Sequence, residues 1–115
     1  MSTIAVDNAR PSAGGTAYSL TDGVAKATCS YDQVAVEIDE SSNVSSVTDV
    51  ATGQSTVNLT NSMNVADAAV VGSAFSVQNW AVAQASGSYN FNTRSASSVF
   101  TDSSGVYTAR FGDLA

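Results

Sequence analysis

The chain has 115 residues, a net charge of −6 and only four cationic side chains, Arg10, Lys26, Arg94 and Arg110. Cations so few and so scattered form no stripe that would neutralise phosphates, which argues against nucleic acid as a partner. The absence of histidine removes the commonest general base and the commonest zinc ligand, so we expect neither an enzyme nor a cofactor.

The targeting and membrane signals are equally sparse. No apolar run approaches the roughly 20 residues that a membrane-spanning helix needs. The opening MSTIAVDNARPS carries neither the charged nor the apolar region of a secretion signal. We therefore expect a protein that is made in a cytoplasm and does not insert into a membrane.

The apolar residues are numerous but small. They make up 43% of the chain, yet 18 of them are alanine and 15 valine, against three leucines, two isoleucines and four phenylalanines. A domain of this length buries roughly two-thirds of its unfolded surface, so its core would be thin. We expect copies of the chain to share a buried face in an assembly of closed rotational symmetry. The specific hypothesis is a homotrimer.

Residues 1–23 read as an arm. A short strand-like piece contains Ile4, Val6 and Asp7, and Pro11 with the following glycines punctuates it as turn and loop. The arm would serve attachment or strand exchange. Residues 24–115 would then form the folded domain.

The first segment of that domain predicts strands up to about residue 42. Val34, Val36 and Ile38 alternate with polar or small residues, which is the pattern of a strand with one wet face. The lone Cys29, between small and aromatic neighbours, is interpreted as a buried small hydrophobe. The neighbouring carboxylates of Glu37, Asp39 and Glu40 fit a solvated strand face better than a catalytic pair across a cleft.

Residues 43–63 predict a β-hairpin. Two strand-like runs flank Ala51–Gln54, where Gly53 can adopt the positive φ of a tight reversal. Threonine and serine on the outer face can hydrogen-bond across strands without adding charge. Such a face also suits contact with a neighbouring subunit.

The remaining segments predict further strands. Residues 64–75 have alanines at near-helical spacing, but Val70, Val71, Phe75 and Val77 favour a strand. Period-two alternation continues in residues 77–84 and 88–94. The last strand places Tyr107, Ala109 and Phe111 on one face and Val106, Thr108 and Arg110 on the other. About seven short strands with regular turn signals predict an all-β, antiparallel β-sandwich, jelly-roll-like, with an extended arm.

One aromatic cluster is a candidate contact site. Trp80 lies near Asn79 in the sequence, and Tyr89 follows on the next predicted strand. Aromatic faces with amide groups bind sugar rings. The same residues also suit a half-buried position at a sheet or subunit interface.

The sequence resembles a C-terminal β domain of bacteriophage tail fibres and related virion appendage proteins of the marine phage type. The resemblance spans about residues 24–113 and is carried by GVAKATCSYD, by NVSSVTDVATGQSTVNLTNSM and by the closing TARFGD. In the family, tryptophan usually stands where this chain has Thr28, and a long shaft separates the arm from the terminal domain.

The resemblance implies a non-enzymatic virion structural protein, located in the virion. Because the shaft is absent, the chain would be a short tail-fibre or spike-like subunit or a capsid-surface fibre, docked to other virion proteins through an arm that includes Ile4, Val6, Asp7 and Pro11. Two alternatives remain open. One is a host-attachment module that binds surface glycan through Trp80, with Asn79 and Tyr89, or through the loops around Gly53 and Gly105. The other is a capsid cement or decoration protein.

Overall fold

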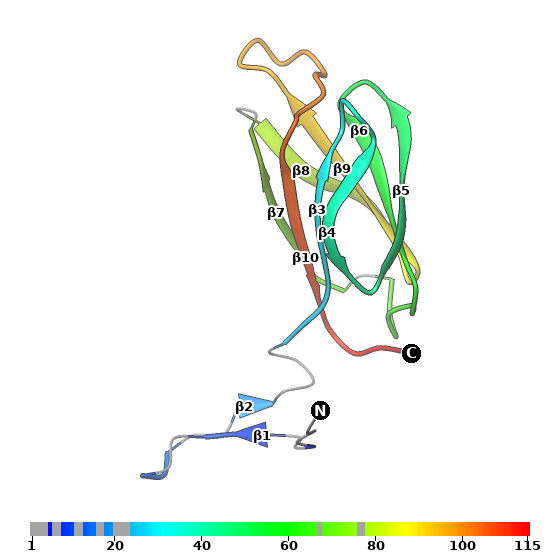
Figure 1. The fold of residues 1–115 in the computed structure, drawn as a ribbon. Coiled ribbons are helices and arrows are strands. Elements are labelled where there is room, and N and C mark those ends of the chain that lie inside the picture. Colours follow the sequence, from blue (N-terminus) through cyan, green and yellow to red (C-terminus); the bar gives the residue numbers. More distant parts are fainter. Residues whose placement is uncertain are drawn as a thin grey trace.

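Two four-stranded antiparallel sheets packed face to face form the body of the molecule (Figure 1). The computed structural model describes residues 5, 8–10, 13–15, 18–19, 24–66, 68–75 and 78–115, with only the backbone of residues 9, 18, 19, 82 and 83. The described residues contain strands and turns and no helix. The predicted antiparallel β-sandwich is confirmed.

The strands follow one another through short connections. In chain order they are β1 (Asn8–Ala9), β2 (Tyr18–Ser19), β3 (Ala25–Asp32), β4 (Glu37–Ser42), β5 (Val44–Ala51), β6 (Gln54–Leu59), β7 (Val70–Ala74), β8 (Gln78–Ala85), β9 (Ser88–Arg94) and β10 (Val106–Phe111). One sheet has the order β4-β3-β10-β7 and the other β5-β6-β9-β8. The short strands β1 and β2 pair only with each other.

The predicted hairpin is present as β5 and β6. Its turn needs Gly53, whose φ is 70° and whose N–H donates to the Asp102 carboxylate at 2.6 Å. Gly53 also accepts a hydrogen bond from the Thr93 N–H at 2.8 Å, which ties the hairpin tip to β9. The predicted strands at residues 70–74, 78–85, 88–94 and 106–111 are confirmed too.

One strand prediction is wrong in part. Val34 and Val36 lie in the turn between β3 and β4, and both are exposed. The Asp32 carboxylate accepts hydrogen bonds from the Val34 and Ala35 N–H groups, so the chain reverses directly after β3. Only the second half of the alternating run, from Glu37 onward, forms a strand.

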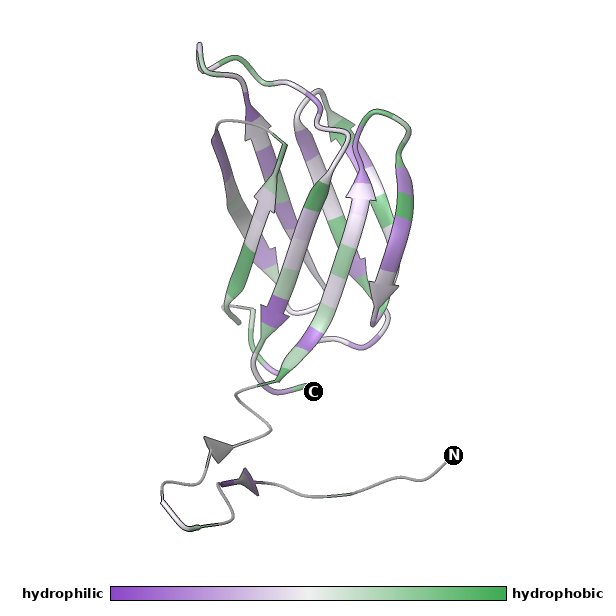
Figure 2. Cartoon of the chain, turned by 60° about the vertical axis from the view of Figure 1, so that its left-hand side comes forward, coloured by the Kyte–Doolittle hydropathy of each residue, from purple (hydrophilic) through white to green (hydrophobic). Residues whose placement is uncertain are grey.

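The alternation along the strands, visible as colour bands in Figure 2, fixes which side chains enter the core. On β10 the buried face carries Val106, Thr108 and Arg110, whereas Tyr107 points outward. Cys29 is buried, as predicted, and burial raises the pKa of its thiol to about 11. The apolar core is Ala27, Cys29, Tyr31, Val57, Leu59, Met63, Ala68, Tyr89, Phe91 and Val106.

Two buried tyrosines bridge the thin core. Tyr31 of one sheet shares a 2.6 Å hydrogen bond with Ser55 of the other, and Tyr89 of the second sheet shares one of 2.6 Å with Thr108 of the first. Each ring therefore fills volume while its hydroxyl is satisfied by the opposite sheet. Because leucine and isoleucine are few, the two tyrosine rings fill interior volume that such residues would otherwise fill.

Candidate interaction surface

The docking residues predicted in the arm, Ile4, Val6, Asp7 and Pro11, lie outside the described residues. The second predicted group is only partly brought together. Asn79 and Trp80 are half-buried on β8, but Tyr89 on β9 is fully buried, with 0% of its surface exposed. Tyr89 points into the core because it shares the inward face of β9 with Phe91. In this fold the Tyr89 side chain is therefore not accessible at the surface, where a receptor or subunit contact would need it.

Trp80 has different neighbours from those expected. The Arg94 guanidinium carbon lies 4.7 Å from the centre of the Trp80 ring and 4.4 Å from that of Phe100, and the two ring centres are 6.2 Å apart. A cation held against the indole occupies part of the surface on which a sugar would stack. Sequence reasoning missed Arg94 and Phe100 because they come from the end of β9 and the long loop after it.

The carboxylates of Glu37, Asp39 and Glu40 are exposed on β4. In the part of the chain that the structure describes, no three His, Cys, Asp or Glu side chains gather closely enough to hold a metal ion. The same part contains no helix of the length and apolarity needed to cross a bilayer.

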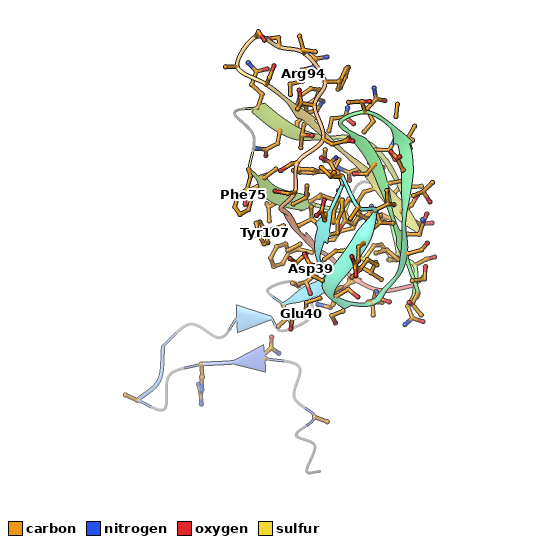
Figure 3. The ribbon with its side chains drawn as sticks, turned by 45° about the horizontal axis from the view of Figure 1, so that its top comes forward. Asp39, Glu40, Phe75, Arg94 and Tyr107 are labelled. Carbon is orange, nitrogen blue, oxygen red and sulfur yellow. The ribbon has the colours of Figure 1, made fainter. Side chains whose placement is uncertain are left out.

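Three exposed apolar side chains lie together on the outer side of β7 and β10. Phe75, directly after β7, is 73% exposed, Val71 on β7 is 55% exposed and Tyr107 on β10 is 43% exposed. We call Val71, Phe75 and Tyr107 the apolar strip. Phe75 and Tyr107 lie side by side in Figure 3, with Arg94 well above them.

Local geometry fixes the strip in place. The Phe75 and Tyr107 rings meet edge to face, with centres 5.8 Å apart and planes at 67°. The Phe75 N–H donates to the Gly105 carbonyl at 3.0 Å, and its ring lies so close to Gly105 that a Cβ there would meet it at 2.6 Å. The strip is thus preorganised by the backbone of β10.

Tyr107 forms a ridge between two shallow depressions. The one toward β7 has a volume of about 400 Å³ and is bordered by Val71, Gly72 and Ala109. The one toward β4 has a volume of about 370 Å³ and is bordered by hydroxyl side chains and Glu40. The outer face is therefore apolar on its β7 side and polar and acidic on its β4 side.

A buried polar cluster holds the turns at one end of the sandwich. The Gln33 amide donates to Ser55 at 3.2 Å, and its oxygen accepts from the Ser103 N–H at 2.8 Å. The Thr93 hydroxyl lies 2.8 Å from the same Gln33 oxygen. This cluster joins the turn after β3, the hairpin strand β6 and the loop before β10.

Arg110 does the same at the other end. It is fully buried, and its guanidinium donates to the carbonyls of Ala85, Ser88 and Ala66 at 2.7–3.1 Å. Burial lowers the pKa of this guanidinium, while the nearby Tyr89 acts in the opposite direction. Because both ends of the sandwich are fixed internally, Val71 and Tyr107 of the apolar strip lie on a well-anchored sheet, and Phe75 lies directly after β7.

Comparison of the chain with protein-family models, with curated proteins and with solved structures found no match.

Proposed function

We propose that the chain is a non-enzymatic structural subunit of a bacteriophage particle, of the short tail-fibre, spike-like or capsid-surface kind, which assembles with copies of itself. The resemblance of residues 24–113 to virion appendage domains supports the phage assignment. The observation that carries the self-assembly is the apolar strip. Val71 and Tyr107 lie on strands, Phe75 directly follows β7 and packs on Tyr107, and all three side chains are exposed in the described chain.

The energetics favour covering the strip. Burial of a Val or Phe side chain contributes about 1.5–3 kcal/mol each. Copies with a net charge of −6 repel one another, but the strip carries no charge, so they can approach there at little electrostatic cost. An uncharged apolar surface on an otherwise acidic chain is therefore a suitable subunit contact.

The first test is the mass of the purified protein at micromolar concentration. We expect an oligomer, and we expect Phe75→Ser to shift it toward the monomer with unchanged β-sheet circular dichroism, because Phe75 contributes little to the interior of one copy. Thr28→Ala, on the polar side of the same sheet, is the matched control and should leave the mass unchanged. A folded wild-type monomer would contradict self-assembly. The homotrimer expected from the sequence stays a prediction that the measured mass checks.

The second test concerns the particle. A labelled form of the chain should be seen by electron microscopy on intact virions, on the tail for a fibre or spike and on the capsid for a surface fibre or cement protein. Its absence from purified particles would remove the virion assignment while leaving the self-assembly standing. Glycan binding through Trp80 gains no support from the arrangement around it, because Tyr89 is buried and Arg94 lies on the indole ring.

A further inference from the structure

The sandwich has four edge strands, each of which presents unpaired backbone groups. They are β4 and β7 in one sheet and β5 and β8 in the other. An open edge is a template for pairing with another chain, and proteins protect such edges with charges or with β-bulges. The four edges differ in how well they are protected.

Three of them carry such protection. β4 carries the exposed carboxylates of Glu37, Asp39 and Glu40. Its register with β3 also shifts, opposite Ser30 and Tyr31. On β5 the register with β6 shifts near both ends of the strand. On β8 it shifts between Ala81 and Gln84. Each irregularity twists or interrupts the row of free N–H and C=O groups.

β7 has none of these features. Its residues Val70–Ala74 contain no charge and no proline, and they pair with β10 without a register shift. It also carries Val71 of the apolar strip, with Phe75 directly after it. The least protected edge therefore also carries exposed apolar side chains, whereas the exposed Val50 of β5 lies at one of that strand's register shifts.

The hydrogen bonds of the β7 segment show which of its N–H and C=O groups point toward β10. The Phe111 N–H donates to the Ala69 carbonyl at 2.9 Å, and the Phe75 N–H donates to the Gly105 carbonyl at 3.0 Å. Bonded pairs alternate along an antiparallel ladder, so the odd-numbered residues of this segment face β10. Val70, Gly72 and Ala74 consequently direct their N–H and C=O groups to the open edge.

We propose that β7 pairs with β7 of a second copy, antiparallel and with a two-fold axis at Gly72. This inference rests on the self-assembly proposed above and names the contact. In this register Val70 lies opposite Ala74 of the second copy and Gly72 lies opposite Gly72, so every outward group finds a partner. Two four-stranded sheets become one continuous sheet across the seam.

The side chains fit the same register. On the outer face Val71 lies opposite Ser73 of the second copy and Phe75 lies opposite Ala69 of the second copy, so each large side chain meets a small one. Phe75 is then diagonal to Val71 of the second copy, a distance that an aromatic side chain spans. The carboxylates of β4 remain at the far edges of the joined sheet, which keeps the like charges apart.

A two-fold seam has a consequence for the number of copies. The contact is isologous, because the same strand is used on both sides, and it closes with two chains. It therefore predicts an assembly with an even number of chains, in contrast to the homotrimer expected from the sequence. A trimer would require β7 to pair with a different strand, and an exchanged arm would occupy the edge without bringing two β7 strands together.

The test is disulfide trapping in the full chain. Val71 and Ser73 of two copies form a non-hydrogen-bonded pair in the proposed register, with Cα atoms about 4.5 Å apart, within reach of a disulfide. Val71→Cys and Ser73→Cys are made as separate variants and then mixed with oxidised glutathione, which takes up the two electrons and two protons as the S–S bond forms. The native Cys29 is buried with its thiol pKa raised to about 11, so it does not compete.

We expect a covalent dimer in the mixture, at least tenfold more abundant than in either variant alone, because each single variant places its cysteine opposite a native valine or serine. Equal cross-linking of Val71→Cys alone would mean a different register and would overturn the proposal. An oligomer by mass without the mixed cross-link would also overturn it, while leaving the self-assembly of the proposed function intact. A monomer without cross-link would contradict both.

Discussion

At the scale of single residues, Arg110 is the side chain on which the interior depends most. Its guanidinium satisfies the carbonyls of Ala85, Ser88 and Ala66, which come from two separate connections. Arg110→Met removes the donors of three partly buried hydrogen bonds. Because a hydrogen bond to a charged group contributes about 1.5–3 kcal/mol, we expect the free energy of unfolding to fall by about 3 kcal/mol in urea denaturation.

Arg94→Met is the matched control for that variant. The Arg94 guanidinium contacts the Trp80 and Phe100 rings, and no hydrogen bond from it to a backbone carbonyl is found among the described residues. Its loss should cost no more than about 1 kcal/mol, the value of a partly exposed cation–π contact. Equal losses of unfolding free energy in the two variants would show that the three carbonyl contacts of Arg110 do not stabilise the fold more than the ring contacts of Arg94 do.

The buried acids predict how stability depends on pH. Burial raises the pKa of the Cys29 thiol from 9.0 to about 11 and that of Tyr89 from 10.0 to about 12, and it raises the pKa of Tyr31 as well. The folded state then holds protons that the unfolded state has lost, so stability falls as the pH rises above 9 and continues to fall through the folded pKa values. Urea denaturation between pH 8 and pH 11 measures this fall.

The Cys29→Ala variant separates the contributions. Without the thiol, the decline should begin near pH 10, where the tyrosines of the unfolded chain ionise, and not near pH 9. A stability that is flat from pH 8 to pH 11 in the native protein would show that these groups do not stay protonated in the folded state.

Individual side chains also show which features of the fold could be predicted from the sequence and which could not. The two faces of β10 were separated correctly, but the pattern of Val106, Thr108 and Arg110 does not say that this face is the buried one. The arginine on this face would favour an exposed face. The structure shows instead that three backbone carbonyls accept hydrogen bonds from its guanidinium. The burial of Tyr89 could not be predicted for the same reason, since alternation gives the period of a strand and not which face is turned inward.

At the scale of elements, the β5–β6 turn depends on one glycine. Gly53 has a φ of 70°, and a Cβ there would lie 2.5 Å from the Thr93 carbonyl and 2.7 Å from the Thr101 N–H nitrogen. Both neighbours are backbone, so they cannot move aside easily. Gly53→Ala should therefore lower the unfolding free energy by about 3 kcal/mol, through strain and loss of the contact between hairpin and loop.

Gly87→Ala is the comparison for that turn. Gly87 joins β8 to β9, has an ordinary φ, and a Cβ there would meet only the flexible Ser62 hydroxyl at 3.1 Å. Its substitution should change the unfolding free energy by less than about 1 kcal/mol, as thermal or urea denaturation would show. If both alanines were tolerated equally, the packing of Thr93 and Thr101 around Gly53 would not be a constraint.

The elements predicted from the sequence were right where the turn chemistry was visible. The Gly53 hairpin and the strand at residues 70–74 follow from glycine and from β-branched runs. The turn after β3 was missed, because Asp32 caps it and contributes neither glycine nor proline. Val34 and Val36 continue the alternation through that turn, so hydrophobic periodicity alone could not detect the reversal.

At the scale of the whole molecule, the sandwich could be predicted and its edges could not. Strand count and alternation establish the class. Which strands end each sheet depends on long-range pairing, such as β10 between β3 and β7, which no local pattern encodes. The apolar strip was hidden for that reason, since Phe75 and Tyr107 are distant in sequence and meet only through this pairing.

The last prediction follows from the division of the chain into an arm and a sandwich. The described strands of the arm, β1 and β2, pair only with each other, and no hydrogen bond found for the described arm residues reaches the sandwich. Residues 24–115 alone should therefore keep the urea unfolding free energy of the full chain to within about 0.5 kcal/mol, the usual range for changes that remove no packed contact. If the proposed function holds, they should also keep the oligomeric mass, because the β7 edge is retained, but lose attachment to the virion. A shortened chain that unfolds or dissociates would show instead that the arm completes the sandwich, either its own or that of a neighbouring copy.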